Sequence, residues 1–393
     1  MRSCITLIIM DRLVAIVPKG KQIDWPLIER TVMAPYVEDM RNTPQTQRWH
    51  GEGDVWTHTR MVCEELVKLD GFQGLPERQR QEVFLATLFH DIGKPAVTKF
   101  EDGHYSTKGH ARRGEQMVRS MLWKEYGLSG SAEARQFRET VCSLIRHHGL
   151  PLHIAESPYE EPHFRAVAAE AELSGDYTWE LQCLVTEADV RGRIADDVPE
   201  LLSDVEYCRL RAQELGCYTG PYSFPDAHTR YRYLDGHPIS PDYPFFNETW
   251  GEVVVVCGLP GTGKDTFIER NYPGLPVVSL DDIRNDLDIL PTENQGRVVQ
   301  KAIEQARGFL RAHQPFVWNA TNLTQMTRAR ILGLCADYKA VARIVFLETP
   351  WEENLHRNSF RTAMVPPAVI ERMLEKLEMP YPLEADDVDW KCI

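Results

Sequence analysis

A glycine-rich segment with one lysine has the composition of a nucleotide phosphate-binding loop. It reads Gly258-Leu-Pro-Gly-Thr-Gly-Lys264, follows the apolar run 252–257 and precedes a helical pattern. Glycines at such a turn let backbone N–H groups point inward, and the helix N-terminus adds partial positive charge. The lysine can then reach the β- and γ-phosphates of ATP. We therefore predict that ATP contacts Gly258, Gly261, Thr262, Gly263, Lys264, Asp265 and Thr266.

The magnesium ligands of this loop depart from the usual pattern. Asp265 stands where a Ser or Thr usually follows the lysine, and Thr266 comes one place later. Either the Thr266 hydroxyl, or Asp265 directly or through water, could reach Mg²⁺. A later strand pattern ends in Asn319 rather than an aspartate. The ligands of Mg²⁺ must therefore come from other residues.

A carboxylate follows the second predicted strand of this region. Asp281 lies where the carboxyl edge of a parallel sheet binds ligands, and Arg284 is three residues later. A hydroxyl that attacks the γ-phosphate needs a carboxylate to orient it and accept its proton. We predict this role for Asp281, with Arg284 pointing the same way if a helix starts here. The alternative is that the aspartate only caps that helix.

Two arginines near the C-terminus are also candidates for phosphate contacts. Arg357 and Arg361 are four residues apart and are expected on one face of a helix. Such a pair repels unless an anion lies between the two side chains, and a transferring phosphoryl group is such an anion. The alternative is a solvated helix face with two unrelated arginines.

Histidine and aspartate side chains in the N-terminal part of the chain could bind metal ions. His90 and Asp91 end an apolar helical pattern, His58 lies on an earlier one, and Asp189 lies far downstream. Each histidine taken singly is more often a core or surface residue, so the combination carries the prediction. Mixed imidazole and carboxylate ligation suits Mn, Co, Ni, Zn or Fe.

The elements that must position these residues divide into two domains, as suits a chain of 393 residues. Apolar stripes at helical spacing run through about 25–215, whereas 218–246 has a loop composition rich in Tyr, Pro and Gly. Strands are then predicted at 252–257, 276–279, 315–318 and 341–346, with helices at 296–312 and 327–336. We predict an all-α domain over 1–235, a linker over 236–250 and an α/β domain with a parallel sheet over 251–393.

Composition limits the class of protein. Hydrophobic residues make up 43% and charged residues 26%, the balance of a soluble globular protein. A net charge of −14 argues against coating nucleic acid through a basic surface but allows a few arginines to grip a strand end. Nine cysteines without a paired framework favour reduced thiols in a cytoplasm. The run Cys4–Met10 is too short to span a membrane and is interpreted as a buried strand or an upstream-start artefact.

The second domain resembles the polynucleotide 5′-kinase family of end-healing enzymes. The matching residues are 258–266, Asp281 with Arg284, 320–323, and Arg357 with Arg361 before Val365-Pro366. The resemblance implies that Asp281 is the general base, that Arg284 contacts the substrate phosphate, and that Arg357 and Arg361 form a lid over ATP. It also implies Mg²⁺ in the kinase site.

The first domain resembles the HD phosphohydrolase superfamily in its order of His, His-Asp and Asp. Segments 108–115 and 144–149 match the members that hold two metal ions. The resemblance implies one or two divalent transition-metal ions held by His58, His90, Asp91, His110, His147 and Asp189. The choice between His147 and His148 stays open. Two ions sharing Asp91 would clamp a phosphate and supply a hydroxide, and Lys94 is placed to touch that phosphate.

The fusion of the two modules in this order resembles the HD-Pnk family of bacterial end-healing enzymes. That resemblance implies an HD domain that hydrolyses 2′,3′-cyclic or 2′-phosphates at RNA ends and a kinase that phosphorylates 5′-OH ends of RNA or DNA. The partners would be RNA and DNA ends, and a nucleic-acid ligase could seal the products. We expect a cytoplasmic protein with no membrane partner.

Two rival interpretations remain. The first is an HD nucleotidase or cyclic-nucleotide phosphodiesterase fused to a small-metabolite kinase, which would prefer free nucleotides. The second is a regulatory switch in which ATP binding controls the HD domain without phosphate transfer. Asn319 in place of an acidic pair, and the short stretch after the loop, argue against this switch.

Overall fold

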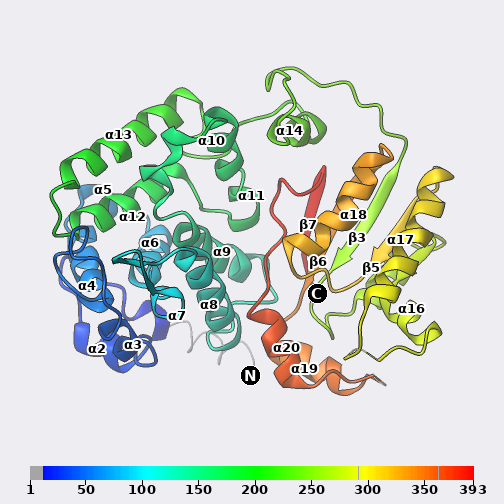
Figure 1. Ribbon diagram of the computed structural model, residues 1–393, viewed down its shortest axis with the longest axis horizontal. Helices are drawn as coiled ribbons and strands as arrows, with labels where there is room; N and C mark the ends of the chain where they lie inside the picture. The colour runs from blue at the N-terminus through cyan, green and yellow to red at the C-terminus, as the bar shows by residue number, and fades with distance from the viewer. Residues whose placement is uncertain (1–11, 291, 362) are drawn as a thin grey trace. The chain divides into compact units, whose positions relative to one another are not determined.

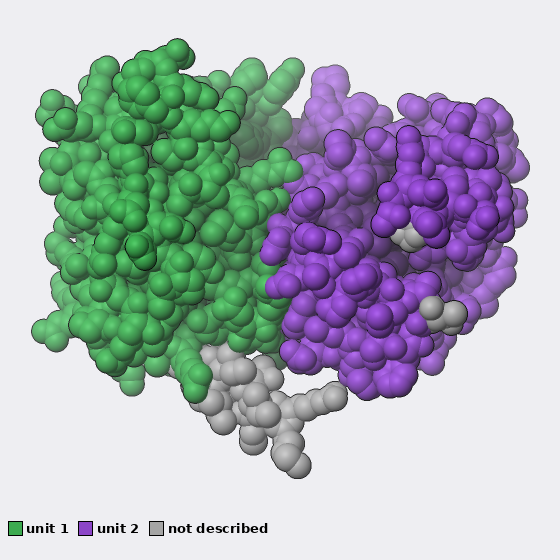
Figure 2. Space-filling view, turned by 60° about the horizontal axis from the view of Figure 1, so that its bottom comes forward, with its two compact units in different colours: residues 1–128, 133–222 green, residues 129–132, 223–393 purple. Residues whose placement is uncertain are grey.

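The computed structural model describes residues 12–290, 292–361 and 363–393, and the chain forms two compact units (Figures 1 and 2). Unit 1 comprises Met1–Leu128 and Glu133–Tyr222, and unit 2 comprises Ser129–Ala132 and Ser223–Ile393. The run Cys4–Met10 lies outside the described residues. Within those residues, every helix is too short or too polar to cross a membrane.

Unit 1 is built almost entirely from helices. They are α2 (Trp25–Arg30), α3 (Val37–Arg41), α4 (Val55–Leu66), α5 (Asp70–Gln73), α6 (Glu77–Phe89), α7 (Lys94–Val97), α8 (His110–Lys124), α9 (Ala132–Arg146), α10 (Glu160–Ala168), α11 (Ala171–Ser174), α12 (Trp179–Arg191) and α13 (Val198–Glu214), with the short 3₁₀ turns η1 (Leu150–Leu152) and η2 (Ile154–Glu156). A two-stranded antiparallel hairpin of β1 (Lys99–Glu101) and β2 (His104–Ser106) is the exception.

Three mutually packed helices, α4, α6 and α12, form the centre of unit 1. Asp54 caps α4 by accepting a hydrogen bond from Thr57 N at 2.8 Å, and Thr178 caps α12 in the same way through Leu181 N. The second half of α6 is buried on every side, which explains why its apolar residues run together without a polar stripe.

A close approach between α7 and α8 depends on one glycine. A Cβ on Gly93 would lie 2.2 Å from His110 O and 2.6 Å from Gly114 N, so a side chain there would collide with backbone. Gly93 thus lets the N-terminus of α8 come close to the turn after α6. His110, the first residue of α8, reaches the neighbourhood of Asp91 for this reason.

Unit 2 is an α/β domain around a five-stranded parallel sheet. Its strands are β3 (Glu252–Cys257), β4 (Val277–Ser279), β5 (Phe316–Asn319), β6 (Val341–Glu348) and β7 (Asp387–Cys392), in the order β4-β5-β3-β6-β7. Its helices are α14 (Ala227–Leu234), α15 (Lys264–Asn271), α16 (Leu280–Asp286), α17 (Gly296–Arg311), α18 (Gln325–Asp337), α19 (Trp351–Ser359) and α20 (Pro367–Leu374). All four predicted strands are present, and the edge strand β7 is an addition.

Register brings the functional segments to one edge of this sheet. Asn319 at the end of β5 pairs with Val256 of β3 on one side and with Ser279 of β4 on the other. The loop after β3 and the helix after β4 therefore begin on either side of the end of β5, at the carboxyl end of the strands.

Two details of unit 2 differ from the sequence predictions. Residues 218–246 were expected to form loop or linker, yet α14 lies within them, because Asp226 caps it through Thr229 N at 2.7 Å and Tyr233 is buried. Helix α14 belongs to unit 2. The domain boundaries at 1–235, 236–250 and 251–393 remain a prediction from the sequence.

The prediction that one helix contains both Arg357 and Arg361 was wrong. Helix α19 ends at Ser359, before Arg361. The Asn358 side chain bonds the chain that follows it, because Nδ2 donates to Val365 O at 2.7 Å and Oδ1 accepts from Val365 N at 3.2 Å. These bonds fold the backbone back, so the two arginines are presented by a helix end and a turn.

A buried ion pair fixes the C-terminal segment of unit 2. Arg328 on α18 is fully buried, and its guanidinium makes a bidentate pair with Glu384 at 2.6 and 2.7 Å. It also donates to Asn322 O at 3.0 Å and Glu378 O at 2.9 Å. One side chain thereby joins the segment behind the glycine-rich loop to the chain that leads into β7.

We predict that Arg328→Met lowers the free energy of unfolding of unit 2 by about 3–5 kcal/mol, because it leaves Glu384 buried without its cation. The measurement is the urea dependence of labelling of Cys257 and Cys335, two buried thiols of this unit. The double variant Arg328→Met/Glu384→Gln should recover much of the loss. Equal labelling of the single and double variants would contradict this account.

Candidate active sites

Unit 1 gathers histidines and aspartates from five separate segments, one of which is the turn after α9 that carries His148. His58 lies on α4, Asp189 on α12, and His90 with Asp91 at the end of α6. His110 begins α8, and all of these except His110 and His148 are buried to within about 1% of full exclusion from solvent. Sequence-distant polar side chains therefore meet inside a helical core, where unpaired charge is costly.

The Asp91 carboxylate stands between two groups of ligand atoms. Its Oδ2 lies 3.2 Å from His90 Nε2 and 3.8 Å from His58 Nε2. Its Oδ1 lies 3.4 Å from His110 Nε2 and 3.9 Å from His148 Nε2. Asp189 Oδ1 completes the first group, 3.0 Å from His58 Nε2. The donor atoms thus form two sets, His58–His90–Asp189 and Asp91–His110–His148, with Asp91 between them.

Backbone carbonyls orient three of these imidazoles in the same way. The Nδ1 atoms of His90, His110 and His148 lie 2.7, 2.9 and 2.8 Å from carbonyl oxygens of the preceding turn. A carbonyl accepts only, so each Nδ1 carries the proton and each Nε2 presents a lone pair toward Asp91. This is the arrangement that protein ligands adopt around a metal ion.

One contact is repulsive without a cation. Nε2 of His110 and Nε2 of His148 lie 3.1 Å apart, and both present lone pairs. His90 Nε2 is also buried and lacks a hydrogen-bond partner among the described residues. A divalent ion between these nitrogens and the carboxylates would satisfy them all. The donor set therefore fits two ions that share Asp91.

Charge and burial set the protonation of this cluster. Burial, together with the neighbouring His110 and His90, lowers the pKa of His148 to about 3, so its imidazole is neutral and ready to bind metal near pH 7. Burial alone would raise the pKa of Asp91, but His90 and Lys94 hold it well below its usual value. Burial likewise lowers the pKa of His110, whereas hydrogen bonds to Asp189 and Glu52 outweigh burial and raise the pKa of His58. The Asp91 side of the cluster therefore offers two neutral imidazoles beside an ionised carboxylate.

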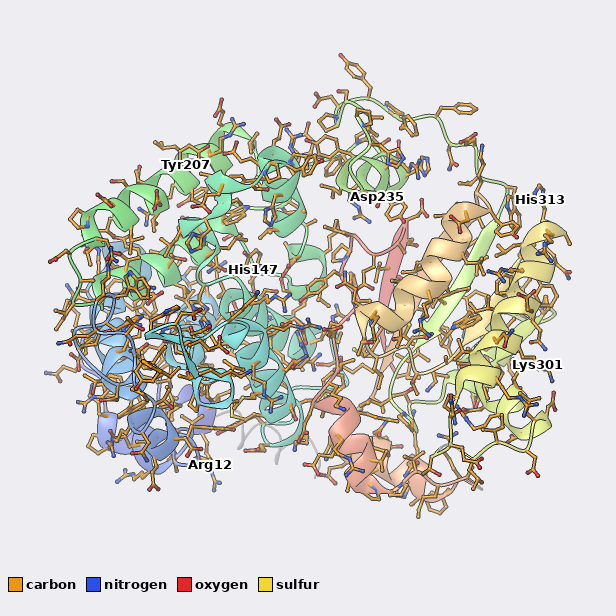
Figure 3. The ribbon with its side chains drawn as sticks, in the orientation of Figure 1. Arg12, His147, Tyr207, Asp235, Lys301 and His313 are labelled. Carbon is orange, nitrogen blue, oxygen red and sulfur yellow. The ribbon has the colours of Figure 1, made fainter. Side chains whose placement is uncertain are left out.

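His147, named from the sequence as the ligand, is replaced here by His148. The His147 Nε2 lies 2.7 Å from Glu170 Oε1 and, within the part of the chain that the structure describes, forms no ion pair with Asp91. Figure 3 labels His147 within the helices of unit 1. Both histidines follow α9, and the turn there aims adjacent side chains in different directions. His148 is the one whose Nδ1 bonds Ile145 O and whose Nε2 faces Asp91.

Two further residues, Glu52 and Arg193, support the cluster and were not predicted from the sequence. Glu52 Oε1 lies 2.8 Å from Nδ1 of both His50 and His58, and Arg193 donates to Asp189 Oδ2 at 2.6 Å. Lys94, which was predicted, contacts Asp91 Oδ2 at 2.6 Å and donates to Gln45 Oε1 at 2.7 Å. The signals were present as charged residues next to predicted ligands, in Gly-Glu52-Gly and four residues after Asp189.

In unit 2, the glycine-rich loop has the backbone that its sequence predicts. Gly258, Gly261 and Gly263 have φ values of 147°, 90° and 82°, which other residues rarely adopt. A Cβ on Gly261 would lie 2.7 Å from Asn354 O, so α19 packs directly against the loop. Helix α15 begins at Lys264, which places a helix N-terminus at the loop.

Lys264 folds back over this loop. Its Nζ donates to Gly258 O at 3.0 Å and Leu259 O at 3.1 Å. Burial lowers the pKa of Lys264 to about 8, against the opposing influence of Asp265 and Asp281. The ammonium is thus held over the curve of the loop, where phosphate oxygens would bind.

Asp265 and Asn319 form a polar pair at the carboxyl edge of the sheet. Asn319 Nδ2 donates to Asp265 Oδ1 at 2.7 Å. Asn319 therefore orients Asp265, and Thr266 is exposed in the same first turn of α15. Both candidate magnesium ligands named from the sequence remain placed for that role.

The Asp281 carboxylate lies near two of the predicted arginines, Arg284 and Arg361. Its Oδ1 lies 2.5 Å from Arg284 Nη1, and its Oδ2 lies 3.8 Å from Arg361 Nη2. The helix cap here is Ser279, whose Oγ accepts from Asp282 N at 3.2 Å, so Asp281 is free of the capping role considered above. Arg357 Nη1 lies 3.7 Å from the place a Cβ on Gly263 would take. The loop, Asp281 and the arginines thus converge on one exposed region.

Each of the two units contains a segment that matches a known domain family. A family model described as HD domain matches residues 55–191, and one described as AAA domain matches residues 253–380. The chain therefore joins an N-terminal helical HD domain to a C-terminal P-loop kinase domain with a parallel sheet, which confirms the predicted fold class. The two domain types indicate an enzyme, and they imply ATP with Mg²⁺ in one site and a divalent metal in the other.

Individual relatives match parts of the chain. The multifunctional CCA protein of Psychromonas ingrahamii is 30% identical over 119 residues, which are 30% of this chain and 25% of that protein. The bifunctional polynucleotide phosphatase/kinase of Schizosaccharomyces pombe is 25% identical over 182 residues, 44% of this chain and 42% of that protein. A putative kinase from Chloroflexus aurantiacus matches in structure with a TM-score of 0.32 and 19% identity, over 37% of this chain and 86% of that one. The chain thus spans less than half the length of these two curated relatives.

The two-set arrangement around Asp91 predicts the metal content of variants. His148→Ala should lose one of two bound Mn²⁺ ions per chain, because it removes a donor from the Asp91–His110–His148 set. His147→Gln, the matched control, keeps a hydrogen bond for Glu170 and should bind metal like the unmodified protein. Equilibrium dialysis followed by elemental mass spectrometry measures the stoichiometry. Loss of metal in His147→Gln with full loading of His148→Ala would refute the assignment.

The lowered pKa of Lys264 predicts that ATP binding depends on pH. Phosphate binding favours the protonated amine, so affinity should be highest below pH 8 and fall as pH rises through 8. Above that value the loss should approach about tenfold per pH unit. Lys264→Arg stays charged and should show a flat profile. Calorimetric titration with ATP between pH 7 and 9.5 makes the comparison, and parallel profiles for both proteins would exclude Lys264 as the titrating group.

Proposed function

We propose that this chain is an enzyme of the HD-Pnk type that heals broken nucleic-acid ends. The kinase domain transfers the γ-phosphate of ATP to 5′-OH ends of RNA or DNA, and the HD domain hydrolyses 2′,3′-cyclic or 2′-phosphates at RNA ends. The observation that carries the proposal is the position of Asp281 between Arg284 and Arg361 at the phosphate-binding edge of the sheet. The S. pombe relative, a bifunctional polynucleotide phosphatase/kinase, supports the same pairing of phosphatase and kinase.

In the kinase site, each residue has a distinct task. Asp281 orients the attacking 5′-hydroxyl and accepts its proton as the new O–P bond forms. The bond between the γ-phosphorus and the bridging oxygen of ATP breaks in the same step, and ADP leaves. Arg284 binds the phosphate of the acceptor strand, and Lys264 holds the β- and γ-phosphates. Arg357 and Arg361 cover the transferring group and balance its charge. ATP would be accompanied by Mg²⁺ near Asp265 and Thr266.

A nucleic-acid end suits the charges around Asp281. An acceptor that is a small neutral metabolite has no need of Arg284, whereas the 3′-phosphodiester of a 5′-OH strand presents an anion close to its hydroxyl. The Arg284 guanidinium is oriented by two acceptors, Asp281 and Gln295 Oε1 at 2.9 Å. Its direction is therefore fixed before the substrate arrives.

In the HD site, the chain supplies a framework for phosphate and water. The metal ions, when bound by His58, His90, Asp91, His110, His148 and Asp189, supply Lewis acidity and an activated water. Lys94 extends past Asp91 and would contact a phosphate oxygen of the substrate. Arg193 holds Asp189, and Glu52 holds His58, so the ligand geometry persists through turnover.

The direct test uses a short RNA with a 5′-OH and a 2′,3′-cyclic phosphate, incubated with ATP, Mg²⁺ and Mn²⁺ and analysed by mass spectrometry. We expect gain of one phosphate at the 5′ end and opening or loss of phosphate at the other end. An untouched RNA, under conditions in which free nucleotides are consumed, would instead support the metabolite enzyme.

Single substitutions should separate the two reactions. Asp281→Ala should lower 5′ phosphorylation by about 10²-fold or more and leave the phosphoesterase intact, because it removes only the general base. Asp282→Ala is the matched control from the same helical turn and should retain kinase activity. Asp91→Ala should abolish the phosphoesterase and spare the kinase. Loss of both activities in a folded single variant would contradict the division of labour.

A further inference from the structure

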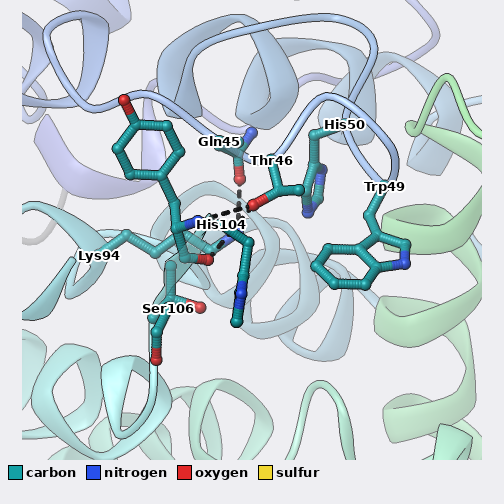
Figure 4. A pocket seen from close by; sticks show the side chains of 9 residues that line it. Gln45, Thr46, Trp49, His50, Lys94, His104 and Ser106 are labelled. Atoms are coloured by element: carbon teal, nitrogen blue, oxygen red, sulfur yellow. Dashed lines mark hydrogen bonds between the residues drawn. The ribbon is translucent and has the colours of Figure 1, made fainter. Parts of the chain in front are cut away.

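A cavity of about 230 Å³ lies in unit 1 beside the Asp91 cluster (Figure 4). Its walls come from segments 45–50 and 104–107 and from Lys94. Two of these residues also border the metal ligands. Lys94 Nζ lies 2.6 Å from Asp91 Oδ2, and the ring of His50 lies 4.8 Å from that of His58 between centroids. A group in this cavity would therefore sit next to a phosphate held at Asp91.

The two walls of the cavity are tied to each other. Tyr105 N donates to Thr46 Oγ1 at 2.9 Å, which joins strand β2 to the loop before α4. Gln45, nearly buried, accepts the hydrogen bond from Lys94. The cavity is thus a fixed part of the domain, since its opposite walls share hydrogen bonds.

Aromatic side chains line the cavity away from Lys94. Trp49 is 40% exposed, whereas Trp56, on the neighbouring helix α4, is buried. The His104 ring lies 6.1 Å from the Trp49 ring at 90°, and Figure 4 shows the two side chains next to each other. Arg48 places its guanidinium 5.9 Å from the same indole. An exposed tryptophan with a neighbouring imidazole and a cation is a surface on which a nucleobase stacks.

We propose that this cavity binds the base of the nucleotide whose 2′,3′-cyclic or 2′-phosphate is hydrolysed. The inference extends the proposed function, because it assigns a base-binding subsite to the phosphoesterase reaction. The base stacks against Trp49 beside His104, while Lys94 meets the phosphate. The volume is below the range of about 300–1,000 Å³ that is common for drug-sized ligands, and it suits one nucleoside rather than a strand.

The alternative occupant is a phosphate or sugar without a base. Lys94 and the hydroxyl of Ser106 could serve such a ligand, but they give no role to Trp49 or His104. A stacked base would remove the apolar surface of the Trp49 indole from water, whereas a phosphate or sugar alone would leave it exposed. The aromatic pair therefore favours a base.

The first experiment measures hydrolysis of two RNAs that differ at one position. Both carry a terminal 2′,3′-cyclic phosphate, and one has hydrogen in place of the last base. The unmodified protein should prefer the base-containing RNA by roughly tenfold or more in kcat/KM, mainly through KM. Trp49→Ala should bring this ratio close to one, and Trp49→Phe should restore most of it. An equal loss on both RNAs, or an unchanged ratio, would overturn the proposal.

Adenosine 2′,3′-cyclic phosphate distinguishes a terminal base from a neighbouring one. If the cavity holds the terminal base, Trp49→Ala should weaken hydrolysis of this mononucleotide as much as that of the oligonucleotide. An effect confined to the oligonucleotide would mean that Trp49 contacts an upstream residue, which contradicts the assignment.

A second experiment does not require turnover. An RNA with 5-iodouridine as its last residue is irradiated with the protein, and the cross-linked peptide is identified by mass spectrometry. Adducts at Trp49 or His104 are expected, and adducts confined to other peptides would overturn the proposal. If the unmodified protein hydrolyses neither RNA, the proposed reaction fails, and this cross-link still decides whether the cavity holds a base.

Discussion

The carboxylate of Asp91 lies in the interior of a helical domain, with one oxygen toward each of two groups of imidazoles. An ionised group at this depth is stable only if cations surround it closely. Lys94 provides one, and the histidine Nε2 atoms direct the rest of the space toward metal ions. The carbonyl bonds at each Nδ1, the glycine that admits α8, and the partners of His58 and Asp189 all serve this constraint. The helices around Asp91 are therefore arranged so that polar groups and candidate metal ligands, rather than apolar side chains, meet its carboxylate.

The kinase domain meets the opposite requirement, because it must bind a highly charged anion at an exposed edge. Its candidate phosphate contacts are the backbone N–H groups of a glycine loop, one lysine and arginines from separate segments. Tight packing behind the site makes this possible, since α19 touches the loop at Gly261 and Arg328 anchors the segment that follows β5. Buried residues here hold the backbone in place, while in the HD domain the buried residues are themselves the candidate metal ligands.

Much of this arrangement could be predicted from the sequence, for physical reasons. An unbroken β-branched run before a glycine loop, and aspartates at strand ends, specify local geometry that neighbours hardly alter. The side of α9 that faces Asp91 could not be predicted in this way, because His147 and His148 differ only in the direction of one turn. The end of α19 depended on Asn358 bonding Val365, and β7 on pairing with β6, both tertiary contacts. Glu52 and Arg193 act through other residues, so spacing alone gave them no distinct pattern.

The proposed function also explains why two domains are needed. Hydrolysis at Asp91 requires water as a reactant beside the phosphate. Phosphoryl transfer at Asp281 requires that the acceptor hydroxyl reach the γ-phosphate before water does, which is the role of a cover such as Arg357 and Arg361. One pocket cannot both admit and exclude water during catalysis. Separate sites, one lined with imidazoles and carboxylates and the other with backbone amides and arginines, allow each reaction its own solvent conditions.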